Sequence, residues 1–151
     1  MPLFDLTRRL LLAAALGAAI GLEREYRRKP AGLRTNILIA LGSALFTAVS
    51  MSMVAGGGTV DRIAAQVVTG VGFLGGGAIL RSGKTVQGMT TAATIWVNAA
   101  IGMAAGAGQF ALAMATTVVT LIVLAVLPPV EDYFDRRTGI KDDDHPRPSD
   151  R

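Results

Sequence analysis

The stretch TGVGFLGGGAIL, Thr69 to Leu80, carries the glycine spacing G-x-G-x-x-G from Gly70 to Gly75. In a dinucleotide-binding turn this spacing follows a strand, opens a helix, and precedes an acidic residue about 20 positions later. Here the glycines lie inside an apolar segment, and no Asp or Glu occurs between Asp61 and Glu131. The sequence therefore disfavours a nucleotide site and predicts a glycine-rich helix.

Two interpretations of these glycines are open. Lipid gives helices no hydrophobic drive to associate, so small residues four positions apart serve to bring helix backbones into contact. Alternatively, the helix unwinds at Gly70–Gly77, and its freed carbonyl groups line a cavity or an ion site. Pairs with the packing spacing are Gly72 with Gly76, Gly17 with Gly21, Gly102 with Gly106, and Ala40 with Ala44 and Ala48.

Composition is typical of packed membrane helices. The 151 residues are 51% hydrophobic, yet only 5% are aromatic and 18 are glycine. Five apolar segments follow one another, which predicts an all-α, polytopic transmembrane bundle of about five helices packed through Gly/Ala seams. The segments are Leu10–Leu22, with a start as early as Leu3, then Ile37–Ala55, Ile63–Leu80, Met89–Ala107 and Phe110–Leu127.

The first of these segments is the shortest, and charged residues lie at its start. The other four approach the ~20 residues that a helix needs to cross ~30 Å of hydrocarbon. Arg8 and Arg9 either extend to the lipid headgroups or pair with Asp5 on the helix. A secretory signal peptide is the alternative for this region, but the basic stretch REYRRKP follows directly.

The distribution of basic residues predicts an orientation. If Glu23–Arg34 lies in the cytoplasm, twelve basic residues fall inside and three outside, as the positive-inside rule favours. The N-terminus is then outside and the C-terminus inside. Pro128 and Pro129 are expected to end the fifth helix, which gives a transmembrane domain over residues 1–130 and a polar, disordered cytoplasmic tail over residues 131–151.

Several classes of function lack the residues that they need. The chain has no cysteine, and its single histidine, His145, lies in the charged tail. Thiolate zinc sites, cysteine nucleophiles and a Ser-His-Asp triad in the apolar body are therefore excluded. We expect no enzyme activity and no cofactor. Nucleic-acid binding is not expected either, because the basic residues gather in a few short segments.

A magnesium site would need carboxylates, and the candidates are few. Glu23, Glu25 and Asp61 lie at the edges of the apolar segments, and none lies within them. Glu23 precedes Arg27 by four residues, and Glu25 comes shortly before Arg28 and Lys29. Ion pairs on a helix are therefore the simpler expectation for both glutamates.

Polar residues at helical spacing mark one face of several segments. Thr90, Thr94 and Asn98 share a face of the fourth segment. These faces either form interhelical hydrogen bonds or line a path for a small solute or ion. Trp96 lies in mid-segment, where packing is expected, and Arg62 is expected to anchor to headgroups. The other polar faces are Gln66 with Thr69 on the third segment, and Ser43, Thr47 and Ser50 on the second.

Five sequence blocks together resemble the MgtC/SapB family of bacterial membrane proteins. They are GLERE (Gly21–Glu25), AGLRTN (Ala31–Asn36), RIAAQVVTGVGFLGGGAI (Arg62–Ile79), TTAATIW (Thr90–Trp96) and AAIG (Ala99–Gly102). The resemblance covers about residues 10–128 and implies a multi-pass protein of the bacterial inner (plasma) membrane. It also implies an alternative for Glu23, namely a contact with Arg34 across the first loop. The motif residues are Glu23, Arg24, Glu25, Arg34, Thr35, Asn36, Arg62, Gln66, Gly70, Gly72, Gly75, Gly77, Thr90, Thr91, Thr94, Trp96 and Asn98.

The resemblance further implies a link to growth in low magnesium. Longer, virulence-associated members of the family carry a soluble C-terminal domain where this chain has a short tail, and the family often has Asn in place of Thr90. Both departures favour a role in general ion or envelope homeostasis over a role in virulence. We therefore expect a non-enzymatic homo-oligomer in the lipid bilayer that modulates a membrane-protein partner. A small ion or solute transporter, for example for Mg²⁺, is the alternative.

Overall fold

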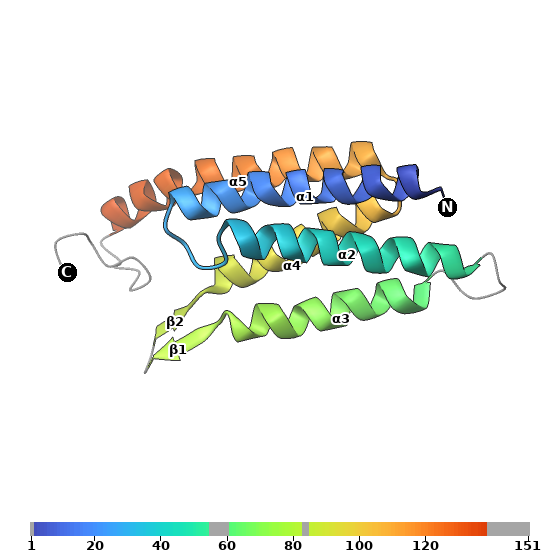
Figure 1. Ribbon diagram of the computed structural model, residues 1–151. Helices are drawn as coiled ribbons and strands as arrows, with labels where there is room; N and C mark the ends of the chain where they lie inside the picture. Colours follow the sequence, from blue (N-terminus) through green and yellow to red (C-terminus); the bar gives the residue numbers. More distant parts are fainter. Residues whose placement is uncertain (1, 55–60, 83–84, 139–151) are drawn as a thin grey trace.

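The computed structural model describes residues 2–54, 61–82 and 85–138 of the chain. Five helices and one two-stranded sheet make up this part of the molecule (Figure 1). The predicted all-α class is confirmed. The elements are α1 (Leu3–Tyr26), α2 (Leu33–Val54), α3 (Asp61–Gly77), β1 (Leu80–Ser82), β2 (Thr85–Gln87), α4 (Met89–Gly106) and α5 (Phe110–Thr138).

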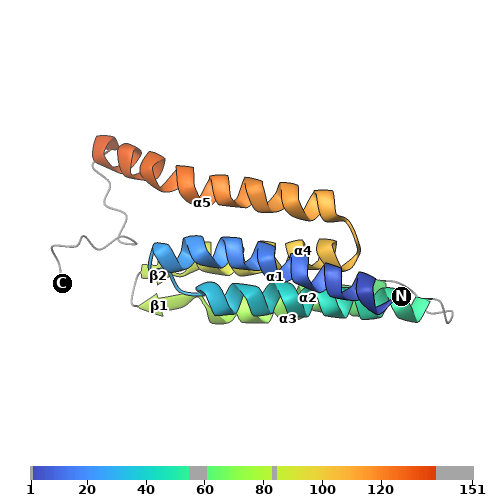
Figure 2. The same cartoon turned by 45° about the horizontal axis from the view of Figure 1, so that its top comes forward.

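Helix α4 is the central helix, because it contacts each of the other four. Helix α2 packs against α1, α3 and α4, whereas α5 contacts α1 and α4. In Figure 2, α5 stands apart from the layer of the other helices and diverges from them toward its C-terminal end. The bundle therefore has a body of α1–α4, with α5 on one side of it.

Small residues allow α2 to approach its neighbours closely. A Cβ atom added to Gly102 of α4 would lie 2.3 Å from the carbonyl oxygen of Ala40, and one added to Gly106 would lie 2.3 Å from that of Ala44. A Cβ atom on Gly17 of α1 would likewise lie 2.7 Å from a backbone oxygen of α2. Backbone contact at these three positions leaves no room for a side chain.

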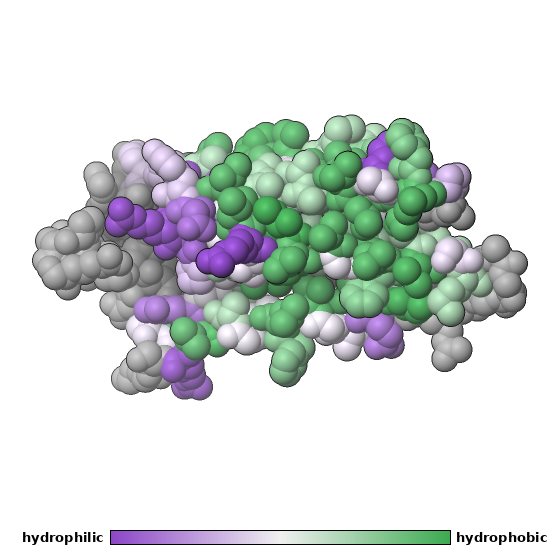
Figure 3. Space-filling view, in the orientation of Figure 1, coloured by the Kyte–Doolittle hydropathy of each residue, from purple (hydrophilic) through white to green (hydrophobic). Residues whose placement is uncertain are grey.

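The interior holds small and polar residues, whereas many large apolar side chains lie outside. Ala13, Ala40 and Asn98 are fully buried, but Phe73 is 82% exposed and Trp96 is 52% exposed. Figure 3 shows apolar side chains covering the middle of the molecule, with hydrophilic residues toward its two ends. A contiguous apolar surface of this kind is rare on soluble monomers and typical of a surface that meets lipid or another protein.

Two segments of the described chain are long and apolar enough to cross a membrane. They are Leu33–Met53 in α2 and Phe110–Val130 in α5. The apolar part of α3, Ile63–Gly77, is shorter. Each of the first two segments has 21 residues, close to the ~20 that a helix needs to cross a membrane. This criterion uses length and composition only.

The connection between α3 and α4 differs from the prediction. The third apolar segment was expected to run as a helix to Leu80, but α3 ends at Gly77. Strand β1 then pairs antiparallel with β2, and Leu80 lies opposite Gln87. Consecutive glycines weaken the end of a helix, and the β-branched residues of β2 favour a strand. Periodicity alone could not detect two strands of three residues each.

Gly88 joins the hairpin to α4 in a way that requires glycine. Its φ angle is +89°, in the left-handed region that side-chain-bearing residues rarely adopt. A Cβ atom there would lie 2.1 Å from the carbonyl oxygen of Ala78. Gly88 therefore sets how closely the end of α3 approaches the start of α4.

Helix α3 is continuous through Gly70–Gly77, so the alternative of an unwound segment there is wrong. The packing interpretation holds for Gly75, where an added Cβ atom would lie 3.4 Å from the carbonyl oxygen of Ala92. It does not hold within the described chain for Gly72 and Gly76, because an added Cβ atom would meet no described atom within 4 Å. These two glycines face outward from the bundle.

Helix α1 begins at Leu3, the earlier of the two predicted starts. Asp5 forms ion pairs with Arg8 and Arg9, each with an N–O distance of 2.8 Å, which is the second of the two predicted alternatives for these arginines. Arg9 Nη1 also donates a hydrogen bond of 2.7 Å to the carbonyl oxygen of Gly106 at the C-terminal end of α4. A cation in this position satisfies a terminal carbonyl group and suits the helix dipole.

Helix α5 continues through Pro128 and Pro129 to Thr138, so the prediction that these prolines end the helix is wrong. Proline has no N–H group, and at Pro129 this leaves the carbonyl oxygen of Ala125 without its usual helical donor. Arg27, the residue that caps the C-terminal end of α1, donates from Nη2 to that oxygen at 3.1 Å, and so replaces the missing bond. Residues 139–151 of the predicted tail lie outside the described residues.

Candidate functional site

The predicted site residues fall into three places, which we call the polar cluster, the α2–α3 groove and the lateral pocket. The polar cluster, between α1, α2 and α4, consists of Glu23, Arg24, Asn36, Thr91, Thr94 and Asn98. The groove is lined in part by Arg34, Thr35, Gln66 and Gly70, and the pocket in part by Trp96. Gly72, Gly77 and Thr90 are exposed, and the side chains of Asp61 and Arg62 lie outside the described residues.

Asn36 and Asn98 form the centre of the polar cluster. Both are fully buried. Asn98 Nδ2 donates to the backbone oxygen of Asn36 at 2.7 Å and to its Oδ1 at 3.1 Å. Asn36 Nδ2 in turn donates to the carbonyl oxygens of Ala31 and Gly32. This chain of bonds joins α4 to α2 and to the loop before α2, so these residues hold three parts of the fold in register.

Arg24 brings a buried charge to the same region. It is 4% exposed, and its Nη2 donates to Thr91 Oγ1 at 3.3 Å. Its Nη1 lies 4.0 Å from Glu23 Oε2. Burial lowers the pKa of the Arg24 guanidinium, and the Glu23 carboxylate partly offsets this. Arginine nevertheless stays charged in proteins, so Glu23 serves as its nearby counter-charge.

The two glutamates have different partners. Glu23 Oε1 lies 2.6 Å from Arg27 Nε, which confirms the predicted ion pair. Glu25 instead accepts a hydrogen bond of 3.2 Å from the backbone N–H of Leu33 at the start of α2, so its expected pairing with Arg28 or Lys29 is wrong. The chain turns sharply at Arg28, which has a φ angle of +53°. This turn brings the start of α2 back toward the Glu25 carboxylate.

The predicted contact between Glu23 and Arg34, both of which the structure describes, is also wrong. Glu23 pairs with Arg24 of α1 and with Arg27 at the C-terminal cap of that helix, whereas Arg34 is exposed and lies at the α2–α3 groove. A carboxylate four residues before an arginine on one helix reaches it with little loss of side-chain freedom. Local pairing therefore prevails over the contact across the loop.

The predicted polar faces are divided between the interior and the surface. On α2, Ser43, Thr47 and Ser50 are all buried, and on α4 Thr94 is buried while Thr90 is exposed. Thr47 and Thr94 donate their hydroxyl protons to carbonyl oxygens four residues earlier on the same helix, at 2.8 and 2.7 Å. Gln66 and Thr69 of α3 are exposed. Several of these hydroxyl groups are thus satisfied within their own helices.

The α2–α3 groove is a large hollow among the described residues, with a volume of about 1080 Å³. Its walls are mainly apolar residues of α2 and α3, with Ile95 of α4 at its floor. Arg34 and Thr35 lie at the end where α2 begins. Gln66 comes from the first half of α3. The groove therefore brings the AGLRTN block next to the glycine-rich block.

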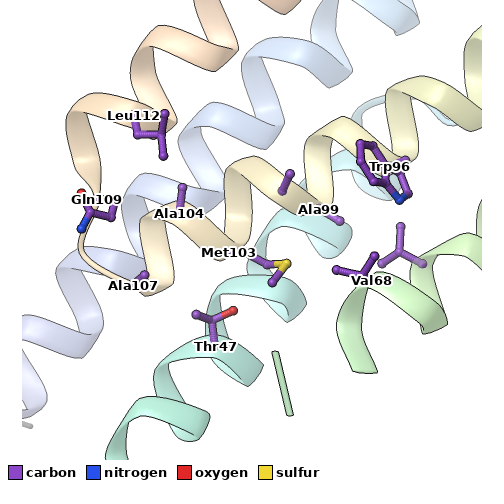
Figure 4. Close-up of a pocket in the computed structure, with 11 residues that line it drawn as sticks. Thr47, Val68, Trp96, Ala99, Met103, Ala104, Ala107, Gln109 and Leu112 are labelled. Carbon is purple, nitrogen blue, oxygen red and sulfur yellow. The ribbon is translucent and has the colours of Figure 1, made fainter. Parts of the chain in front are cut away.

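The lateral pocket has a volume of about 470 Å³ and lies beside α4. Residues of α2, α3, α4 and the start of α5 line it, and nearly all of them are apolar. Figure 4 shows Trp96 and Val68 at one end of the pocket and Gln109 and Leu112 at the other. Trp96 is half exposed, so its side chain is not fully packed within the described chain, and its predicted packing role stays a prediction.

The carboxylates of the described chain are poorly placed for a metal ion. Among the described residues, no three His, Cys, Asp or Glu side chains group together. Glu23 lies against two arginines, and Glu25 accepts a backbone hydrogen bond. A Mg²⁺ ion binds carboxylates that are free to coordinate it alongside water, and each of these glutamates already has a partner.

Some features of the site were not identified from the sequence. The spacing of Ala13, Gly17, Ile20 and Arg24 places Arg24 on the buried face of α1, and this helical phase could have revealed its burial. The contact of Arg27 with Ala125 joins residues 98 positions apart, and no local pattern signals it. Gly42 in the groove and Met103 in the pocket likewise become visible only when the helices are assembled.

Comparison with known proteins agrees with these motifs. The model of the MgtC family matches residues 10–133. Protein MgtC of Salmonella typhimurium is 49% identical over 121 residues, 80% of this chain and 52% of that protein. The putative magnesium transporter YhiD of Escherichia coli K12 is 53% identical over 125 residues, 78% of this chain and 58% of that protein.

A third relative, the protein slr0014 of Synechocystis, is 43% identical over 129 residues, 85% of this chain and 55% of that protein. The chain thus spans about half the length of the curated relatives that it matches. No solved structure matches it. The family model covers nearly all of the helical body, including the polar cluster, the groove and the pocket, and the chain therefore belongs to the MgtC family.

Proposed function

We propose that this protein is a non-enzymatic, multi-pass protein of the bacterial inner membrane that modulates other membrane proteins in magnesium-linked homeostasis. The observation that carries this proposal is the lateral pocket with the half-exposed Trp96 beside it. The magnesium link rests on a relative, which is named a putative magnesium transporter.

The arrangement of charge supports insertion in a membrane. The basic residues Arg27, Arg28, Lys29 and Arg34 surround the connection between α1 and α2. At the opposite end of α1, Arg8 and Arg9 are paired with Asp5. Apolar side chains cover the surface between these ends (Figure 3). The positive-inside rule then favours the basic connection in the cytoplasm and the N-terminus outside.

The lateral pocket suits a transmembrane helix of a partner. In a membrane, helices associate through close packing rather than through a hydrophobic drive. A preformed apolar hollow offers such packing, and tryptophan is enriched among the residues that dominate interface energies. The pocket extends from Trp96 in the middle of α4 to Gln109 in the α4–α5 connection, and nearly all of its lining is apolar, so the partner that it fits is an apolar helix.

Association of the chain with itself forms a second part of the proposal. Gly72 and Gly76 of α3 are exposed and have the spacing of close-packed membrane helices. An added Cβ atom at either would meet no described atom of the chain within 4 Å, so both backbones are open to a neighbour.

Trp96→Ala is expected to weaken docking of the partner by roughly 30-fold, because a central tryptophan contributes ~2 kcal/mol at such an interface. A photoreactive amino acid at Ala100, an exposed residue of the pocket, should crosslink the partner in intact cells. The crosslink should disappear in Trp96→Ala protein. Growth in low magnesium should fail in the same variant.

The matched control places the same photoreactive group at Ile122 of α5, which is similarly exposed but does not line the pocket. It should give no discrete protein adduct. Equal adducts from both positions, or an adduct at Ala100 that Trp96→Ala leaves unchanged, would show that the pocket does not select a partner.

Transport of magnesium is the second candidate, and the name of the Escherichia coli relative favours it. The ion pair of Glu23 with Arg27 and the backbone bond of Glu25 favour modulation instead. Purified protein in liposomes is therefore expected to give no saturable Mg²⁺ flux, with Na⁺ and K⁺ as controls. A saturable Mg²⁺ flux that Glu23→Gln abolishes would establish the transporter and replace the proposal above.

A further inference from the structure

The α2–α3 groove is long, apolar and open. Its lining extends along α2 from Arg34 to Phe46, a distance of about 18 Å at 1.5 Å per residue. One leaflet of a bilayer has ~15 Å of hydrocarbon, half of the ~30 Å core. The groove therefore matches the length of an extended acyl chain that begins at the surface of one leaflet.

The walls of the groove are built to meet lipid. Leu38 and Phe46 of α2 and Leu74 of α3 are each more than half exposed, and all three line the groove. Its volume of about 1080 Å³ is slightly above the range for sites that take small organic ligands, ~300–1,000 Å³. A hollow of this size beside exposed apolar side chains suits a flexible hydrocarbon chain.

Two glycines make room for such a chain. Gly42 of α2 and Gly70 of α3 both line the groove. A Cβ atom added to either would meet no described atom within 4 Å, so neither glycine is required by packing inside the chain. A larger side chain at either position would narrow the groove, so the two glycines keep the hollow open.

The charge at one end of the groove indicates which lipid would fit. Arg34 and Thr35 lie at the end where α2 begins, and both are exposed. A guanidinium group binds a phosphate through paired N–H donors, and a hydroxyl group adds a further donor. Arg28 and Lys29 of the adjoining loop add positive charge at the same end of the molecule.

We infer that the α2–α3 groove binds one anionic phospholipid, with its phosphate at Arg34 and one acyl chain along Gly42 and Gly70. This inference rests on the membrane insertion proposed above. The acyl chain gains little by leaving the surrounding lipid, because that lipid is equally apolar. Selection therefore comes from the headgroup, and the glycines only provide space.

The test is native mass spectrometry of the full chain in detergent, titrated with phosphatidylglycerol or with zwitterionic phosphatidylcholine. The unmodified protein should retain one phosphatidylglycerol. Gly70→Phe should abolish retention by filling the groove. Arg34→Gln should lower it roughly fivefold, the effect of one basic residue near an anionic surface, and remove the preference for phosphatidylglycerol.

Two control variants carry matched changes outside the groove. Thr69→Phe places the same ring on the exposed neighbour of Gly70, and Arg8→Gln removes an exposed arginine at the opposite end of α1. Both should retain lipid like the unmodified protein. Loss in Thr69→Phe equal to that in Gly70→Phe, or equal retention of both lipids by the unmodified protein, would overturn the inference.

A polypeptide retained in place of lipid would also overturn it, because the groove would then be a protein-docking site. The result of the lipid-binding test can be distinguished from the result of the crosslinking test of the proposed function. A protein that is inserted in the membrane and crosslinks through Ala100, but shows no headgroup preference, would leave the proposed function standing and remove only the lipid site.

Discussion

Gly102→Leu is expected to prevent the native packing of α2 against α4. A Cβ atom at this position would lie 2.3 Å from the carbonyl oxygen of Ala40 and 2.9 Å from its Cα atom. Both are backbone atoms, so no side-chain rotation relieves the clash. Overpacking a core typically costs ~1–3 kcal/mol, and we expect about 3 kcal/mol or more here because two helix backbones must separate.

Thermal unfolding of the purified protein in detergent measures this effect. Gly102→Leu should lower the midpoint by many degrees or yield no folded protein. Gly42→Leu is the matched control, since it makes the same change on α2 where an added Cβ atom meets no described atom within 4 Å, and it should leave the midpoint nearly unchanged. A Gly102→Leu variant as stable as the control would contradict the close approach of α2 and α4.

Asn98→Leu is expected to destabilise the bundle by about 1–2 kcal/mol. The change removes the two hydrogen bonds that Asn98 Nδ2 donates to Asn36. It also leaves Asn36 Oδ1 buried without that donor, which costs more than a lost bond at the surface. Interhelical hydrogen bonds in membranes average below 1 kcal/mol but reach ~1.7, and full burial of both residues places this pair toward the upper end.

Equilibrium unfolding in detergent, followed by helix content, provides the comparison. Gln66→Leu makes the same kind of amide-to-leucine change at an exposed position of α3 and should have an effect within ~0.5 kcal/mol. Equal stability of the Asn98→Leu and Gln66→Leu variants would mean that the Asn36–Asn98 contact does not hold α2 to α4.

The helices of this protein could be predicted from local pattern more readily than the contacts between them. Apolar runs near the length of a membrane span placed α2, α4 and the start of α5 close to their observed bounds, because length and hydropathy are properties of one segment. The end of α3 and the β1–β2 hairpin were missed, since strands of three residues carry little periodic signal. The continuation of α5 depends on Arg27, which caps a different helix.

The candidate site shows the same division. The pairing of Glu23 with Arg27 was predictable because the two residues have a spacing of four at the end of one helix. The approach of Asn98 to Asn36 spans 62 positions, and the spacing of Thr90, Thr94 and Asn98 gives only a shared face. The glycines show most clearly what spacing alone cannot predict. Gly72 and Gly102 belong to pairs of the same spacing, yet one faces outward and the other contacts Ala40.

The central claim is that the chain crosses the membrane five times, because partner docking and lipid binding both depend on it. The chain has no cysteine, so single cysteines introduced at exposed residues can be labelled in intact cells with a membrane-impermeant maleimide without background. The account predicts labelling from outside at Thr7, Ser52 and Gln109, and only after permeabilisation at Lys29, Gln87 and Tyr133. Labelling of Lys29 or Gln87 from outside, or recovery of the protein in the soluble fraction, would contradict it.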